Sequence, residues 1–80
     1  MARYYFDMRD GDELALDEEG MELSEFREVQ TEAAMSLADM ARDTIRRRRG
    51  QANRHHMAIE VRDKSGPVMQ AKFTFDITKG

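Results

Sequence analysis

A run of four arginines, Arg46, Arg47, Arg48 and Arg49, is the densest group of charged side chains in this sequence, and Arg54 follows it closely. Guanidinium groups bind phosphate oxygens through paired hydrogen bonds, so these five residues are candidates for contact with an anion or a nucleic acid. A solvated helix end also explains the run, because cationic side chains interact favourably with the C-terminal end of a helix dipole. We keep both interpretations and do not favour the nucleic-acid one.

Two adjacent histidines, His55 and His56, are the next candidates, here for a metal site. Neighbouring residues of a strand point to opposite faces, so the pair could chelate one ion only from a loop and with ligands from elsewhere. The acidic segment 10–19 does not follow a calcium-binding loop, since the sixth position counted from Asp10 is Ala15, where glycine is required. We therefore predict no metal site and no cofactor.

A catalytic centre is equally hard to assemble from these residues. The sequence has no cysteine, no serine in a nucleophile elbow and no glycine-rich phosphate loop, because Gly11 and Gly20 stand alone. Carboxylates are plentiful, but they fall in expected turns, where no burial would tune them for acid–base catalysis. We expect that the protein is not an enzyme, and no small-molecule substrate is indicated.

The net charge of −3 hides an uneven distribution along the chain. Residues 1–45 hold thirteen acidic and four basic side chains, whereas residues 46–80 hold three acidic and nine basic ones. Attraction between the two parts, within one fold or across a dimer, is the interpretation that we favour. A basic patch for an anionic partner is the alternative.

A long amphipathic helix, expected over residues 25–49, is the element that must position most of these groups. Placed at 100° steps, six apolar side chains fall on one stripe: Phe26, Val29, Ala33, Leu37, Met40 and Ala41. Ser24 is the expected N-cap, Arg27 leaves the capping box incomplete, and Gly50 is expected to end the helix. Such a helix is about 30–37 Å long, against about 20 Å for a six-residue strand, so it must cross the sheet obliquely or overhang it.

The apolar arc of this helix is wider than one stripe. Ala34, Ala38 and Ile45 flank the stripe, and Met35 lies opposite it, where we expect it to be exposed. A chain of 80 residues buries only about 60% of the surface of its unfolded state, less than a larger domain does, and this one has no disulfide to stabilise it. We therefore interpret these four residues as a candidate self-association surface.

Four strands are expected from alternating apolar and polar side chains, at residues 3–9, 13–17, 57–62 and 67–75. The dipeptide at 10–11, Asp-Gly, predicts a tight hairpin between the first two strands. Residues 50–56 are expected to form a polar linker. In the first hairpin, the alternation predicts that Phe6, Leu14 and Leu16 point toward the core.

These elements predict an α+β fold of the ββαββ type. We expect a two-layer sandwich, in which one long helix covers one face of a four-stranded, mainly antiparallel sheet. Residues 1–80 are expected to form a single domain. No apolar segment approaches the 18 or so residues of a membrane span. Since no signal-peptide pattern is present either, we expect a cytoplasmic location and no membrane partner.

Three segments carry a resemblance to a known family: the opening RYYFDMRDG, the acidic DEEGMEL before the helix, and the stretch from IEVRDKSGPV to FTF. They resemble a family of short uncharacterised proteobacterial proteins, which open with an aromatic strand and a DG turn and end in a strand–DxxG–strand hairpin. The likeness covers nearly the whole chain, and it implies no catalytic residues because the family is a domain of unknown function. The ββα part is also similar in architecture to HicB-type antitoxins, although this chain carries no recognisable DNA-binding appendage.

The function that these observations favour is a small, non-enzymatic interaction module that self-associates as a homodimer. The alternative is a nucleic-acid-binding or antitoxin-like regulator that uses the arginine run 46–49.

Overall fold

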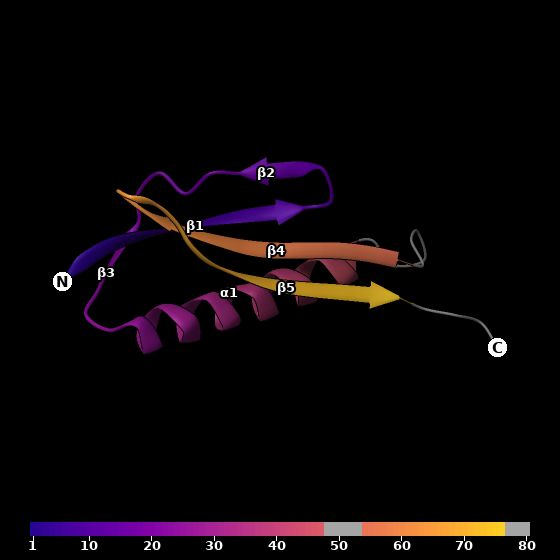
Figure 1. The fold of residues 1–80 in the computed structure, drawn as a ribbon. Helices are drawn as coiled ribbons and strands as arrows, with labels where there is room; N and C mark the ends of the chain where they lie inside the picture. Colours follow the sequence, from indigo (N-terminus) through magenta and orange to yellow (C-terminus); the bar gives the residue numbers. More distant parts are fainter. Residues whose placement is uncertain (48–53, 77–80) are drawn as a thin grey trace.

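The computed structural model describes residues 1–47 and 54–76, which form one helix and an antiparallel sheet (Figure 1). In chain order the elements are β1 (Ala2–Asp10), β2 (Glu13–Ala15), β3 (Met21–Leu23), α1 (Phe26–Arg47), β4 (Arg54–Asp63) and β5 (Gly66–Asp76). The predicted α+β class and ββαββ order are confirmed, and the helix covers one face of the sheet. The three-residue strand β3 is an addition that the alternation did not predict.

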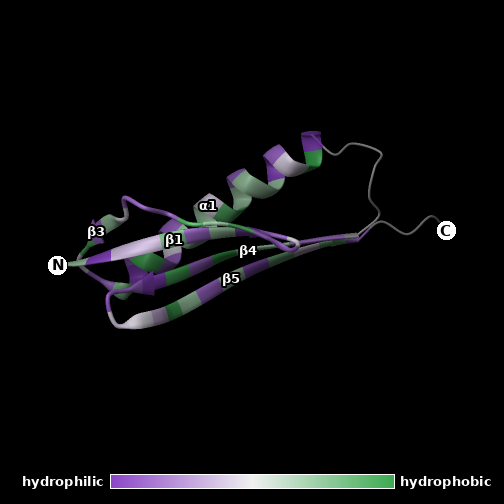
Figure 2. Ribbon diagram, turned by 90° about the horizontal axis from the view of Figure 1, so that it is seen from above, coloured by the Kyte–Doolittle hydropathy of each residue, from purple (hydrophilic) through white to green (hydrophobic). Residues whose placement is uncertain are grey.

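The strand order across the sheet is β2-β1-β4-β5, and β3 also pairs with β1. β2 pairs with residues 8–10 of β1 and β3 with residues 2–4, so these two short strands lie beside opposite ends of the same strand. β2 lies on the side of β1 away from β4 (Figure 1), and so does β3 (Figure 2). β1 and β4 are therefore the central strands, and β5 forms the opposite edge.

The register of the β1–β2 hairpin reverses one prediction. Gly11, at φ +62°, opens a two-residue loop, so that Arg9 pairs with Leu14. Because the loop has two residues, each odd-numbered residue of β1 pairs with an even-numbered residue of β2. Two residues that pair across strands lie on the same face of the sheet. The prediction that Leu14 and Leu16 point toward the core is therefore wrong. Leu14 shares the outer face with Arg9, and Leu16, just after β2, is 61% exposed.

The core lies between α1 and the strands β4 and β5. Its buried apolar residues are Val29, Ala33, Leu37 and Ala41 of α1, with Met57, Ile59 and Val61 of β4. Phe6 and Phe73 are partly buried and pack against this cluster. Phe26 was expected in the same stripe but is about half exposed, since it occupies the first helical position, ahead of the turns that the sheet covers.

The N-terminus of α1 is capped one residue later than the sequence predicts. The helix begins at Phe26, and the Oε1 atom of Glu28 accepts hydrogen bonds from the backbone N–H of Ser24 (2.8 Å) and of Glu25 (3.1 Å). In a capping box, the side chain of the third helical residue accepts the backbone N–H of the N-cap residue. Because the helix begins at Phe26, that third residue is Glu28, whereas a start at Glu25 would have made it Arg27. The amides of Glu25 and Ser24 lower the pKa of Glu28 below its ordinary value.

The helix and the two long strands match in length. The 22 residues of α1 span about 33 Å, and the 11 residues of β5 span about 36 Å. β4 begins at Arg54, three residues before the expected start, so part of the expected linker belongs to the sheet. The helix is inclined to the strands, as one of the two expected arrangements requires, and its C-terminal end diverges from the sheet (Figure 2). β4 and β5 continue past the C-terminal end of α1, so the helix does not overhang the sheet along the strands (Figure 1).

Candidate interaction surfaces

The predicted self-association residues lie on an exposed part of α1. Met35 is 58% exposed and Ile45 is 40% exposed, and Ala34 and Ala38 are exposed as well. The predicted exposure of Met35 is confirmed. Ala34, Ala38 and Ile45 are separated by four and seven residues, a spacing that places them along one line of a helix. We call these three residues, together with Met35, which lies further round the helix, the helix flank.

The helix flank lies on the β5 side of α1. The other side of the helix is marked by Met40, Thr44 and Arg47, which line a hollow of about 370 Å³ together with residues of β1 and β2. At 3.6 residues per turn, Ala38 and Ile45 are turned by roughly 140° around the axis from that group. Because α1 packs chiefly against β4 and β5, the side away from β1 and β2 is the side of β5.

The described part of the arginine run is an exposed helix end. Arg46 and Arg47 form the basic last turn of α1, and both are exposed. The Nε atom of Arg47 lies 3.0 Å from the carboxylate of Asp43, one turn earlier. Such an exposed pair contributes about 0–1 kcal/mol, so it holds the arginine weakly. Outside the described residues lie Arg48, Arg49 and the side chain of Arg54.

The two histidines lie on opposite faces of the sheet, as adjacent residues of one strand must. His55 contacts the carboxylate of Asp10 on the side that faces α1. His56 is exposed on the outer face, where its Nδ1 atom lies 3.2 Å from the hydroxyl oxygen of Thr74. Within residues 1–47 and 54–76, no three potential metal ligands of the His, Cys, Asp or Glu type come together.

A polar network that the sequence did not predict lies on the outer face of the sheet, away from α1. Arg62 of β4 donates hydrogen bonds from Nε to Oδ2 of Asp7 (2.8 Å) and from Nη2 to the backbone oxygen of Asp17 (3.0 Å). The Asp7 carboxylate also accepts the backbone N–H of Asp17 (2.9 Å). The guanidinium carbon of Arg62 lies 4.6 Å from the centre of the Tyr5 ring, a cation–π contact. Asp7 is 5% exposed, so these donors take the place of water around its carboxylate.

Asp17 closes the part of the β1 edge that β2 and β3 leave open. Its carboxylate accepts the backbone N–H groups of Phe6 (3.0 Å), Glu19 (3.1 Å) and Gly20 (3.1 Å). Burial by itself would raise the pKa of Asp17, but these three amides and the charge of Arg62 outweigh it, so the pKa lies below its ordinary value. The D-x-x-G motif at residues 17–20 is a local sequence signal for this turn. No local signal predicts the hydrogen bond between Asp17 and Arg62, which are 45 positions apart.

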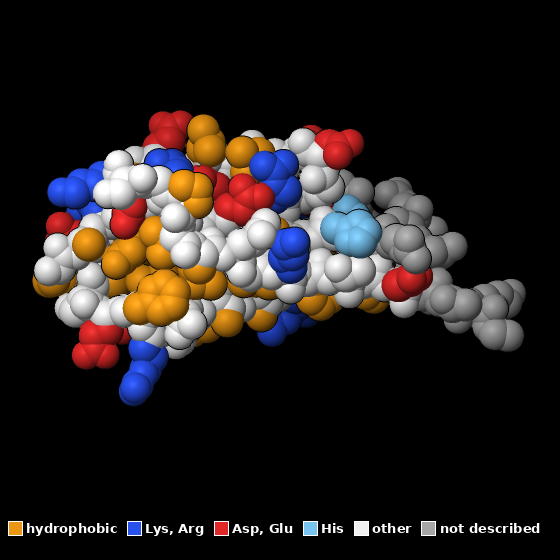
Figure 3. Space-filling view, viewed as in Figure 1, with side chains coloured by type: hydrophobic (Ala, Val, Ile, Leu, Met, Phe, Trp, Pro, Cys, Tyr) orange, Lys and Arg blue, Asp and Glu red, His pale blue; other side chains and the backbone are white. Residues whose placement is uncertain are grey.

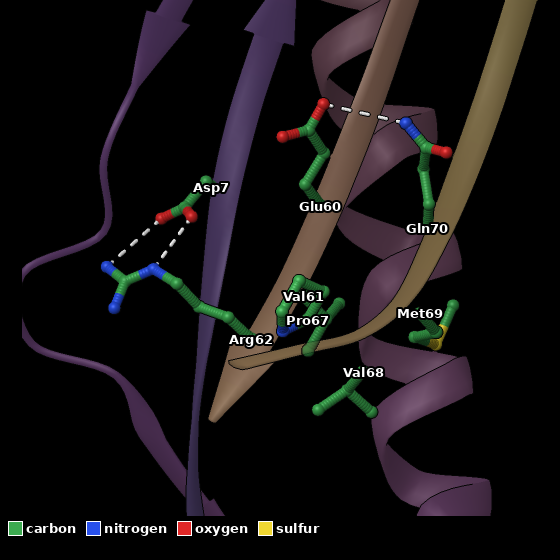
Figure 4. Close-up of a pocket in the computed structure, with 8 residues that line it drawn as sticks. All are labelled: Asp7, Glu60, Val61, Arg62, Pro67, Val68, Met69 and Gln70. Carbon is green, nitrogen blue, oxygen red and sulfur yellow. Dashed lines mark hydrogen bonds and ion pairs between the residues drawn. The ribbon is translucent and has the colours of Figure 1, made fainter. Parts of the chain in front are cut away.

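Next to this network, the outer face is hollowed where β4 turns into β5. Figure 4 shows Asp7 and Arg62 on one side of this hollow, and Pro67 and Val68 on the other. Its volume is about 430 Å³, and hydrophobic side chains gather at this end of the outer face (Figure 3). Because Asp7 and Arg62 are bonded to each other, the hollow presents a shallow, mostly apolar surface beside a satisfied ion pair.

The uneven charge along the chain is partly balanced inside the fold. Asp7, from the acidic first part of the chain, forms an ion pair with Arg62, from the basic last part. This contact supports the favoured interpretation, in which the two parts attract each other within one fold or across a dimer. In the described part of the chain, no helix is both long and apolar enough to span a membrane.

Comparison with known proteins supports one of the two resemblances. A search of curated proteins and a search of solved structures found no match, so no finding supports the likeness to HicB-type antitoxins. The likeness to a family of uncharacterised proteins is confirmed. A family model described as a domain of unknown function (DUF6894) matches residues 3–74, a range that runs from β1 into β5. The chain therefore belongs to this family of unknown function.

Proposed function

We propose that this protein is a small, non-enzymatic interaction module that self-associates as a homodimer. The observation that carries the proposal is the helix flank, whose apolar side chains are exposed in the single chain. Covering apolar surface is favourable by about 25 cal/mol per Å² removed from water. An 80-residue chain buries a limited share of its surface alone, so a second copy adds stability that one copy lacks.

The polar groups of the outer face support an interaction role over catalysis. Arg62 is bonded to Asp7, and Arg9 to Glu60 with 2.6 Å between Nε and Oε2. These charged groups are directed at each other, and they lie on an open sheet surface with Asp7 buried beneath Arg62. A general acid or base needs a position within hydrogen-bonding reach of a bound substrate, which this arrangement does not provide.

Sedimentation velocity and light scattering test the proposal directly. We expect a mass near twice that of the monomer at tens of micromolar, the range of a moderate dissociation constant. Ile45→Glu places a charge on the helix flank and is expected to shift the chain toward monomer. Leu14→Glu is the matched control, because Leu14 is 43% exposed, close to the 40% of Ile45, but lies at the other edge of the sheet.

Two results would contradict this proposal. A monomer at about millimolar concentration, well above any physiological dissociation constant, would remove self-association altogether. A dimer that Leu14→Glu disrupts and Ile45→Glu does not would instead assign the contact to the β2 edge and away from the helix flank.

A second candidate function is weak nucleic-acid binding by the end of α1. It is favoured by the exposure of Arg46 and by the weakness of the exposed Arg47–Asp43 pair, which a phosphate group could replace. With about four phosphate contacts, the logarithm of the binding constant should fall with the logarithm of salt concentration at a slope of about −3 to −4. Labelled duplex and single strands are titrated at about 50 and 200 mM salt. No binding at the lower salt would remove this candidate.

A further inference from the structure

The two edges of the sheet are closed to different degrees. On the β1 side, β2 covers residues 8–10, β3 covers residues 2–4, and Asp17 accepts the amide of Phe6 in the gap. β5 forms the other edge, and within residues 1–47 and 54–76 no strand pairs with its outer side. An antiparallel strand of 11 residues therefore ends the sheet, with alternate backbone N–H and C=O groups directed outward.

Features that would protect this edge are confined to its beginning. Natural edge strands are blunted by proline, by bulges or by charged side chains that point inward. β5 has Pro67 and a register shift against β4 near its start, but its pairing is regular from residue 69 onward. In that regular part, Ala71 and Phe73 pack against the core and the charged Lys72 is exposed. The edge is thus apolar on the helix side and able to accept another strand.

The helix flank lies on the same side of the molecule as this edge. Neighbouring strands of a sheet are about 4.8 Å apart. When a second copy pairs with β5, the two-fold axis that relates the two copies runs half of this distance outside β5. That axis lies about 5 Å from the line midway between β4 and β5. α1 packs against these two strands, so rotation about that axis places the two helices about 10 Å apart. Helices pack directly at about that distance, and the small side chains of Ala34 and Ala38 allow the close approach.

We infer that two copies of the chain pair through β5, antiparallel and centred on Ala71, to form one continuous sheet with both helices on the same face. Ala71 is the middle residue of β5, so this register uses the full strand. It sets Gln70 opposite Lys72 of the partner and Met69 opposite Phe73 of the partner, so no like charges are opposed. The contact is isologous, which closes the assembly at two copies. The inference rests on the proposed self-association and adds the surface and register to it.

A single introduced cysteine tests the register, because the native chain has no cysteine. Directly opposed residues of an antiparallel pair have Cα atoms about 4.5–5.5 Å apart, within the range of a disulfide. Mild oxidation of Ala71→Cys should therefore produce a covalent dimer that a reducing agent separates. Ala15→Cys is the matched control on β2, at the other edge of the sheet, and should remain a single chain on a non-reducing gel.

A pair of charge variants at Gln70 tests the same contact without relying on a disulfide. Gln70 is exposed on the outer face, where it donates to Glu60 at 3.5 Å. Gln70→Lys sets like charges opposite Lys72 of the partner twice in the dimer, and should weaken association about tenfold at low salt. Gln70→Glu should strengthen association, and salt should reduce both effects. Thermal unfolding of each variant confirms that the monomer is folded, since the introduced lysine is also placed to pair with Glu60.

The outcomes separate this inference from the proposal on which it rests. One set of results would overturn the β5 interface and leave self-association standing. In that set the native chain is a dimer, Ala71→Cys forms no more disulfide than the Ala15→Cys control, and both Gln70 variants associate as the native chain does. A native chain that stays monomeric would overturn both. If Ala71→Cys does not fold, opposite shifts in the two Gln70 variants support the interface, and equal association constants overturn it.

Discussion

Arg62 of β4 holds Asp7 of β1 through two hydrogen bonds, with Nε 2.8 Å from Oδ2 and Nη2 3.4 Å from Oδ1. The two residues are diagonal neighbours across the strands, since Arg62 pairs with Tyr5 in the ladder. Asp7 is buried, and the same guanidinium bonds to the backbone of Asp17. One side chain thus ties together β1, β4 and the segment that leads from β2 to β3.

Loss of this arginine should be costly. Arg62→Leu leaves the buried Asp7 carboxylate without its cation, and we expect a clear loss in the free energy of unfolding. Urea unfolding measures the change. Arg42→Leu is the control, because Arg42 forms an exposed pair with Asp39 at 3.7 Å that should contribute less than about 1 kcal/mol. Equal losses in the two variants would contradict a structural role for the network.

The lowered pKa of Asp17 predicts a loss of stability in acid. Its ionised form is favoured in the folded chain, so it stabilises the fold above the unfolded-state pKa of about 4. That contribution is lost as the pH falls through the lower folded-state pKa. Asp17→Asn should therefore be less stable than the native chain at pH 7, and the difference should shrink below about pH 4. Glu18→Gln, an exposed neighbour, is the control, and a difference that stays constant with pH would be against this prediction.

Gly20 is placed where a side chain should not fit. Its φ is +73°, and an added Cβ would lie 2.9 Å from Cγ of Arg3, 2.9 Å from Cε2 of Tyr5 and 3.0 Å from the backbone oxygen of Tyr4. Gly11 has a similar φ of +62°, but an added Cβ there meets nothing within 4 Å. We expect Gly11→Ala to cost about 1 kcal/mol for the backbone conformation alone, and Gly20→Ala to cost clearly more. Equal melting temperatures for the two variants would show that the packing around Gly20 yields easily.

Two leucines should respond very differently to truncation. Leu37 is 9% exposed and belongs to the core cluster, so Leu37→Ala should cost about 2–4 kcal/mol through lost burial and a cavity. Leu16→Ala should cost less than about 1 kcal/mol, because its side chain is largely in water in the folded chain. Denaturant unfolding of both variants measures the contrast. If Leu16→Ala lowered the free energy of unfolding of the monomer by as much as Leu37→Ala, Leu16 would point into the core, as its alternation predicts.

The elements of this fold were predictable because their signals are local. The 3.6-residue spacing of Val29, Ala33 and Leu37 predicts a buried helix face, and these residues do form the core. Period-two alternation predicts the long strands, and Asp10-Gly11 predicts the first turn, since glycine adopts positive φ without strain. The exposure of Met35 follows from its angle on the same helix. Each of these inferences depends on residues within a few turns or one hairpin.

Tertiary structure decided what depends on pairing between distant segments. Leu14 has the alternation of an inward residue, but the register of a two-residue loop turns it outward. β3 is three residues long, too short to show a period, and exists because β1 offers it an edge. The contact of Asp7 with Arg62 joins residues 55 positions apart, and no spacing in the sequence predicts it. By itself the sequence determined which segments are helical or extended and which positions on α1 are buried. Only the tertiary structure decided the strand order, the register and the position of β5 at the edge of the sheet. The hydrogen bonds that pair strands join backbone N–H and C=O groups, which are the same in every residue except proline, so the sequence does not specify which strands pair.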